Sequence, residues 1–159
     1  MGKKIAKVIA AFVFLAGTNV IAHGQDKGIN LGRLAVSAFI CSTFAEYAEK
    51  KDEQRRLFKI GYEAGKKLLE GVMNKTLPEE QISKAPLFFT LRLGGPTVDF
   101  MLGRIFEGMS EEALDKVVKH DAEGKYIPDP AKWNHGQELQ ALIASNKYEK
   151  SNCTLIRMP

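Results

Sequence analysis

Two histidines near the carboxyl end bring residue types that suit metal or acid–base chemistry. His135 and Glu138 stand three positions apart, so one helical turn would present both side chains to a single ion. His120 and Asp121 would complete a ligand set if the chain folded back on itself. A lone His-x-x-Glu pair is common by chance, and a surface or capping role is the competing interpretation. The alternative function that depends on this region is a metal-dependent or small-ligand-binding enzyme.

A Gly-Gly-Pro turn at residues 94–96 precedes a predicted helix and leaves the first N–H groups of that helix free. Helix N-termini attract anions, and Arg92 and Arg104 are close enough in sequence to join a small acidic-ligand site. The negative charge of Asp99 would oppose an anion there. The alternative is a structural role, in which Asp99 accepts hydrogen bonds from the first amides of the helix or pairs with an arginine. The sequence marks no nucleophile with its base and no phosphate loop. We therefore lean against an enzyme, and we expect no catalytic residues, metal or cofactor.

Two aromatic residues, Phe100 and Trp133, are candidates for contact with a partner protein. Phe100 lies off the apolar stripe of its predicted helix and shares a side with Arg104 and Glu107. Aromatic and arginine side chains are enriched at binding hot spots, although Phe100 would equally pack on residues 87–93. Trp133, the only tryptophan, has the same two interpretations. The predicted partner-binding residues are Arg92, Phe100, Arg104 and Trp133.

The chain has two cysteines, Cys41 and Cys153, which lie far apart in the sequence. In an oxidising compartment such a pair is expected to form a disulfide. A reactive thiol is the alternative, but neither cysteine has a basic neighbour that would activate it. The predicted disulfide ties the carboxyl-terminal tail to a central helix.

Apolar residues recur with helical spacing along most of the chain, and no segment alternates with period two over more than a few residues. The sequence predicts an all-α, single-domain bundle of about five to six helices with one long-range disulfide. The expected helices span 34–48, 52–73, about 96–109, 110–120 and 130–145, with a short one started by the capping box at 76–79.

The helix predicted at 52–73 has one apolar and one charged face. Its charged face places acids four residues before bases, which is typical of a solvated, mutually paired surface. Gly61 and Gly65 lie in the apolar face, where glycine lowers helix stability unless close packing compensates. We expect this strip to pack on the small residues Ala38 and Ala45 of the preceding helix.

The first 24 residues have the order of a secretory signal peptide. Lys3, Lys4 and Lys7 precede an uninterrupted apolar run at 8–16, which ends at Gly17. Small residues then permit cleavage before His23 or Gln25. The run is too short for a spanning helix, so an uncleaved anchor is the weaker alternative. The domain prediction is a signal peptide at 1–24 and a helical domain at 25–159.

Charge and composition narrow the function. The 159 residues carry a net charge of +4, but loss of the leader removes three lysines and leaves +1, with 20 basic against 19 acidic residues. No basic block interleaved with aromatics remains, so nucleic-acid binding is not expected. The sequence predicts a periplasmic or secreted bacterial protein with no membrane span after cleavage. It would bind another envelope protein as an inhibitor, an immunity-like protein or an accessory subunit, and its oligomeric state is not predicted.

Overall fold

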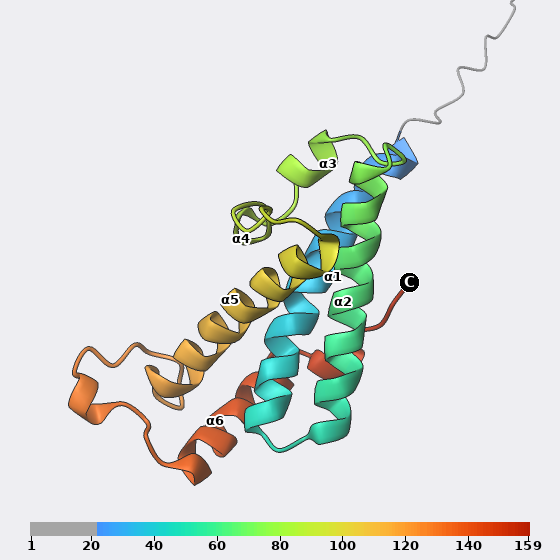
Figure 1. The fold of residues 1–159 in the computed structure, drawn as a ribbon. Coiled ribbons are helices and arrows are strands. Elements are labelled where there is room, and N and C mark those ends of the chain that lie inside the picture. The colour runs from blue at the N-terminus through green and yellow to red at the C-terminus, as the bar shows by residue number, and fades with distance from the viewer. Residues whose placement is uncertain (1–21) are drawn as a thin grey trace, which may run out of the picture.

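A computed structural model describes residues 22–159 of the protein, so the predicted signal peptide at 1–24 lies almost entirely outside the described residues. The described part is mostly helical and contains no β-strand, which confirms the helical class (Figure 1). None of its helices combines the length and hydrophobicity that crossing a bilayer requires. The elements in order are α1 (Ala22–Tyr47), α2 (Lys51–Met73), α3 (Glu80–Ser83), α4 (Leu87–Thr90), α5 (Val98–Val118), the 3-10 turn η1 (Pro130–Lys132), α6 (Gln137–Lys150) and the 3-10 turn η2 (Cys153–Leu155).

Helices α1 and α2 form an antiparallel hairpin, and α5 crosses it obliquely (Figure 1). The predicted amphipathic pattern of α2 is confirmed, because its apolar face is buried against its neighbours. The atoms nearest to the glycine strip do not belong to Ala38 or Ala45, the residues expected to pack on it. A Cβ added to Gly61 would meet the Phe39 ring, and one added to Gly65 would meet Leu102 of α5. The two glycines therefore make room for large side chains from two helices.

Helix α1 begins at Ala22, twelve residues before the predicted start at Leu34. Glycines at 24, 28 and 32 lower the helix propensity of this stretch, which is why the sequence pattern places the start of the helix too late. Leu31 and Gly32 are nevertheless buried, and a Cβ on Gly32 would touch Ala85 and Pro86. Packing against the segment after α3 thus extends a helix that its local sequence does not favour.

One long helix, α5, replaces the two helices predicted from Pro96 and from Ser110. Thr97 is its N-cap and accepts a hydrogen bond from the amide of Phe100. Ser110 resembles a second cap in the sequence, but its hydroxyl accepts a hydrogen bond from Thr43 of α1 at 2.9 Å. An unbroken buried stripe runs along the helix at Leu102, Ile105, Met109, Ala113 and Val117.

Before and after α5, two helices begin at other residues than the capping signals in the sequence predict. Thr76 does not cap α3; its hydroxyl donates to the carbonyl of Gly71 at the end of α2. Asp129 caps only the 3-10 turn η1, and α6 begins later, at Gln137. Ile143 of α6 is buried, whereas Leu139 and Leu142 are exposed. Trp133 therefore lies before α6 and outside any helix.

The predicted disulfide between Cys41 and Cys153 is confirmed and joins α1 to η2 across 112 residues. It lies in the second of two core clusters, among residues from α1, α2, α5 and α6. The first cluster lies between α1, α2, α4 and α5 and includes the fully buried Phe39 and Phe89. Both clusters include residues of α5, so the position of this helix is fixed along its whole length.

Candidate functional site

Three of the four predicted binding residues meet at the turn between α4 and α5. Arg104 donates to the carbonyl of Gly94 at 2.6 Å, and the Phe100 ring fills the space beside Gly95. The Arg92 guanidinium lies 3.6 Å from the centre of the Phe88 ring. Gly95 has φ 158°, at the edge of the left-handed region, and any Cβ there would collide with Phe100. Internal contacts thus hold both arginines and Phe100 at the turn.

Asp99 does not cap α5 or pair with an arginine. Its carboxylate accepts a hydrogen bond from the Tyr62 hydroxyl at 2.6 Å and lies 4.0 Å from the Lys66 ammonium. These contacts fasten the first turn of α5 to α2. The carboxylate also adds negative charge where the sequence suggested an anion site, so the geometry does not favour an acidic ligand there.

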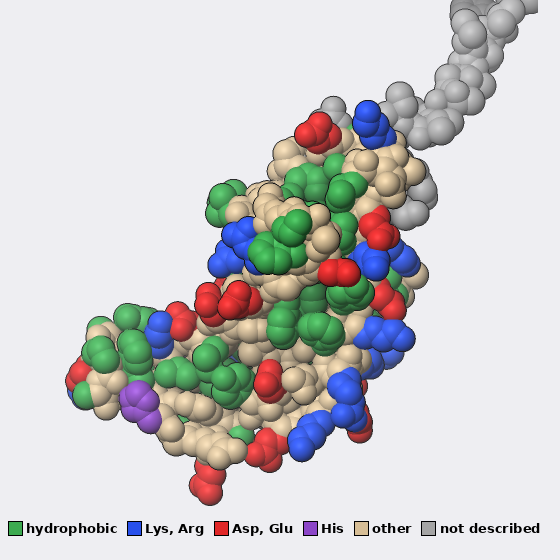
Figure 2. Space-filling view, viewed as in Figure 1, with side chains coloured by type: hydrophobic (Ala, Val, Ile, Leu, Met, Phe, Trp, Pro, Cys, Tyr) green, Lys and Arg blue, Asp and Glu red, His purple; other side chains and the backbone are tan. Residues whose placement is uncertain are grey.

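Large apolar side chains are exposed on the same turn. Leu87 is 72% exposed, Leu91 is 69% exposed and Phe100 is 51% exposed. Leu87 and Leu91 are four residues apart and project from one side of α4, while Phe89 is fully buried and anchors it. Figure 2 shows hydrophobic and basic side chains together over α4 and the following loop. We call this region the α4 surface; it comprises Leu87, Leu91, Arg92, Phe100 and Arg104.

Trp133 does not join the α4 surface. It lies against the carboxyl end of α5, where Lys119 stands 5.1 Å from the centre of its ring. Its indole N–H donates to the carbonyl of Ile127 at 3.0 Å. Because α5 has 21 residues, its two ends are roughly 30 Å apart. Trp133 instead packs the loop between α5 and α6, which projects from one end of the molecule (Figure 1).

His120 and His135 do not form part of a metal centre with other residues in the described part of the chain. The Nδ1 atom of His120 lies 3.1 Å from the carbonyl of Asp115, and its ring packs edge-on against Tyr126. The Nε2 atom of His135 lies 3.4 Å from the carbonyl of Pro130. Within residues 22–159, no three His, Cys, Asp or Glu side chains are grouped so that they would hold a metal ion. The enzyme hypothesis therefore gains no ligand set from the His120 and His135 region.

Two grooves that the sequence analysis missed flank α5. One holds about 580 Å³ and is mainly apolar, between the end of α2, α3 and the start of α5. The other holds about 480 Å³ between α1 and α5 and combines aromatic and acidic residues. Each groove is lined by helices distant in sequence. The sequence does contain a local signal for the groove between α1 and α5. Glu107 and Glu111 are like-charged residues four positions apart, and Gly103 lies four positions before Glu107.

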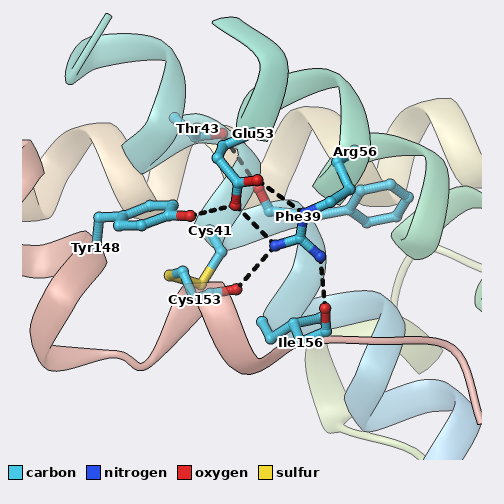
Figure 3. Close-up of a disulfide and its surroundings, with 8 residues drawn as sticks. All are labelled: Phe39, Cys41, Thr43, Glu53, Arg56, Tyr148, Cys153 and Ile156. Carbon is cyan, nitrogen blue, oxygen red and sulfur yellow. Dashed lines mark hydrogen bonds and ion pairs between the residues drawn. A yellow bond between two sulfur atoms is a disulfide. The ribbon is translucent and has the colours of Figure 1, made fainter. Parts of the chain in front are cut away.

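A partly buried polar network holds the carboxyl-terminal tail beside the disulfide (Figure 3). Arg56 of α2 donates to the carboxylate of Glu53 at 2.8 and 3.0 Å. The same guanidinium donates to the carbonyls of Ile156 and Cys153 at 2.6 and 3.2 Å. The Tyr148 hydroxyl completes the network by donating to Glu53. Side chains of α2 and α6 thus secure a tail that has little helical structure of its own.

These hydrogen bonds change the ionisation of both acids in the network. The bond from Arg56, with a second from Tyr148, lowers the pKa of Glu53 from its ordinary value of 4.5 to about 2. Burial, together with the Glu53 carboxylate, raises the pKa of Tyr148 from 10.0 to about 12. At neutral pH the carboxylate is charged and the phenol is protonated, which is the state that the hydrogen bonds require.

The network predicts an acid-sensitive contribution to stability. Glu53→Gln removes the charged acceptor of the Arg56 and Tyr148 hydrogen bonds and is expected to lower the free energy of unfolding at pH 7. The expected loss is only about 1 to 2 kcal/mol, because the carboxylate is partly exposed to water. The lowered pKa means that this contribution is complete above about pH 4.5 and is lost as the pH falls through about 2. Denaturant unfolding at a series of pH values measures the difference between wild type and variant. Glu63→Gln, which changes an exposed pair, is the control; a Glu53→Gln difference that persisted unchanged at pH 2 would contradict the assignment.

No protein-family model, curated protein or solved structure matches the chain, so its own geometry carries the functional argument.

Proposed function

We propose that the protein is exported to the bacterial envelope and acts there by binding another protein through the α4 surface. The observation that supports this proposal is the exposure of Leu87, Leu91 and Phe100 beside two positioned arginines. Inhibition of an envelope-attacking enzyme, immunity to a toxin or an accessory role in an envelope complex would each use such a surface. The alternative is a ligand-binding protein or enzyme that uses the His120 and His135 region.

The α4 surface has the composition of an interface core. Clustered apolar side chains surrounded by polar groups mark interaction sites, whereas single exposed leucines do not. Burial of apolar area supplies about 25 cal/mol per Å², and arginine adds directional hydrogen bonds that fix the partner's orientation. Leu87 and Leu91 contribute nothing visible to the core, which is formed on this helix by Phe89. Their exposure is therefore better explained by a partner than by folding.

Pre-ordering of the surface supports the same proposal. Arg92 is stacked on Phe88, and Arg104 is bonded to the backbone of Gly94. Side chains that are already ordered lose less conformational freedom on binding, so more of the contact energy appears as affinity. The buried Phe89 keeps the short helix α4 in place while the partner binds.

Site-specific photocrosslinking in the cell that encodes the chain tests this proposal. A photoreactive phenylalanine analogue at position 100 is expected to give one discrete crosslinked product in the periplasmic fraction, where the chain should begin at His23 or Gln25. The same analogue at Lys67, on the exposed face of α2, is the control and is expected to give none. The pair Leu87→Ser and Leu91→Ser should reduce the product at least about tenfold, since truncation of a hot-spot residue costs about 2 kcal/mol or more.

Two results would overturn the proposal. Equal products from positions 100 and 67 would mean that the α4 surface has no preferred partner. Retention of the intact leader in the membrane fraction would contradict export as a cleaved protein.

A further inference from the structure

The groove between α1 and α5 has a wall from each helix. Thr43, Glu46 and Tyr47 line it from the last turns of α1. The α5 wall consists of Gly103, Phe106, Glu107, Ser110, Glu111 and Leu114. Figure 2 shows acidic side chains beside hydrophobic ones over α5 and the adjoining part of α1. The groove holds about 480 Å³, enough for a long side chain and part of its backbone.

The groove is held open by packing. The Thr43 hydroxyl donates to Ser110 at 2.9 Å, which fixes the spacing of the two helices. Phe106 is packed between the rings of Phe39 and Phe58, with centroids 5.3 and 5.0 Å away. A Cβ on Gly103 would meet nothing within 4 Å, so this glycine leaves open space where most residues would project a side chain.

The acids of α5 differ according to whether they face the groove. Away from it, Glu112 pairs with Lys116 at 2.6 Å, and Asp115 pairs with Lys119 at 2.7 Å. At the groove, Glu107 and Glu111 form no ion pair with any residue in 22–159. They also stand four residues apart, a spacing at which like charges repel and destabilise a helix. Glu46 adds a third exposed carboxylate from α1, likewise without an ion pair in the described chain.

We propose that this groove receives a lysine or arginine side chain of the partner protein, an inference that rests on the proposed binding function. A cation there would relieve the repulsion between Glu107 and Glu111 and gain charge-assisted hydrogen bonds. Its aliphatic stem would lie along the aromatic and leucine residues of the walls, Phe106, Tyr47 and Leu114. An anionic or purely apolar occupant would lack these interactions.

The groove adjoins the α4 surface. Phe100, Gly103 and Glu107 follow one another at spacings of three and four along α5, so they share one side of the helix. A partner segment that covers Phe100 is therefore directed along α5 into the groove. The two sites would act together, with apolar contact at Phe100 and charge recognition at Glu107.

A titration with defined peptides tests the groove independently of any natural partner. The probe is tetra-arginine amide, added at low ionic strength to the ¹⁵N-labelled protein with its disulfide intact; tetra-citrulline amide is the neutral analogue. Tetra-arginine is expected to shift the amide signals of Tyr47, Gly103 and Ser110 in a saturable way. The neutral peptide should leave them unchanged because it lacks the charge.

Charge and steric variants then locate the binding. Combining Glu107→Gln and Glu111→Gln should raise the dissociation constant about tenfold. Combining Glu112→Gln and Glu123→Gln removes the same charge elsewhere and should change it less than about twofold. Gly103→Leu should abolish binding by filling the groove, and it is not expected to lower the melting temperature, because a Cβ at this position meets no atom within 4 Å.

Each contrary result overturns the inference. If both double glutamate variants weakened tetra-arginine binding equally, the peptide would be attracted only by the net charge of the protein. If Gly103→Leu bound the peptide as tightly as wild type, the peptide would bind outside the groove. Binding of tetra-citrulline as tight as that of tetra-arginine would exclude charge recognition.

Failure of the proposed function is distinguishable from failure of this inference. If the proposed function is wrong, the crosslinks from positions 100 and 67 are equal, whether or not tetra-arginine binds the groove. With a partner captured at position 100, the Glu107→Gln and Glu111→Gln pair should lower the crosslink yield, and an unchanged yield would contradict the groove's role in that complex.

Discussion

Removal of the Cys41–Cys153 disulfide is expected to lower the free energy of unfolding by about 4 kcal/mol. The bond closes a loop of more than 100 residues, and such a loop strongly restricts the unfolded chain. Domains of this size are stable by only about 5 to 15 kcal/mol, so the loss would be a large part of the total. The bond also fixes η2 against α1, and without it the tail depends on the Arg56 hydrogen bonds and on contacts of Ile156.

Guanidinium unfolding measures this loss on the variant that combines Cys41→Ser and Cys153→Ser. Wild type treated with dithiothreitol should match the variant, while the variant itself should not respond to the reductant. A loss below about 1 kcal/mol would contradict the expectation and would mean that the network around Arg56 holds the tail almost unaided. Hydrogen exchange distinguishes local from global effects: amides of η2 should exchange faster in the variant than those of α2.

The features that the sequence predicted well are those determined by residues close together or by simple counting. Helix α2 has an uninterrupted apolar face and acids in its first turn, so its pattern and the structure agree within one residue at the start. The two cysteines permitted a single intramolecular pair, and that pair is present. Phe100 is 51% exposed, whereas the favoured interpretation of the sequence is that it packs on residues 87–93.

The features that the sequence did not predict depend on contacts between distant segments. Ser110 followed by two glutamates resembles a helix start, but the helix continues through it, and its hydroxyl accepts a hydrogen bond from Thr43, 67 positions earlier. The groove likewise requires residues from α1 and α5 to meet, which no periodicity shows. The like-charged pair Glu107 and Glu111 is visible in the sequence, but only the structure shows that open space at Gly103 lies beside it and makes the pair part of a groove.

Gly61→Leu is expected to destabilise the protein by about 3 kcal/mol, at the upper end of the range for an overpacked core. The Cβ atom alone would lie 2.6 Å from the Phe39 ring, closer than real side chains approach. The ring can move only by displacing its neighbours, because it is 1% exposed and packs against Phe58 and Phe106. The substitution would therefore separate α1 from α2 or displace the ring toward the groove that Phe106 lines.

Gly103→Ala is the matched control, since it also replaces a helical glycine by a residue with a Cβ. Its Cβ meets nothing within 4 Å, so the higher helix propensity of alanine should raise stability by about 1 kcal/mol. Thermal melts should therefore shift in opposite directions for the two glycines. An unchanged or higher melting temperature for Gly61→Leu would contradict close packing of α1 on α2. Because Phe39 supports Phe106, the Gly61→Leu protein should also bind tetra-arginine more weakly, which would connect the packing of the hairpin to the groove.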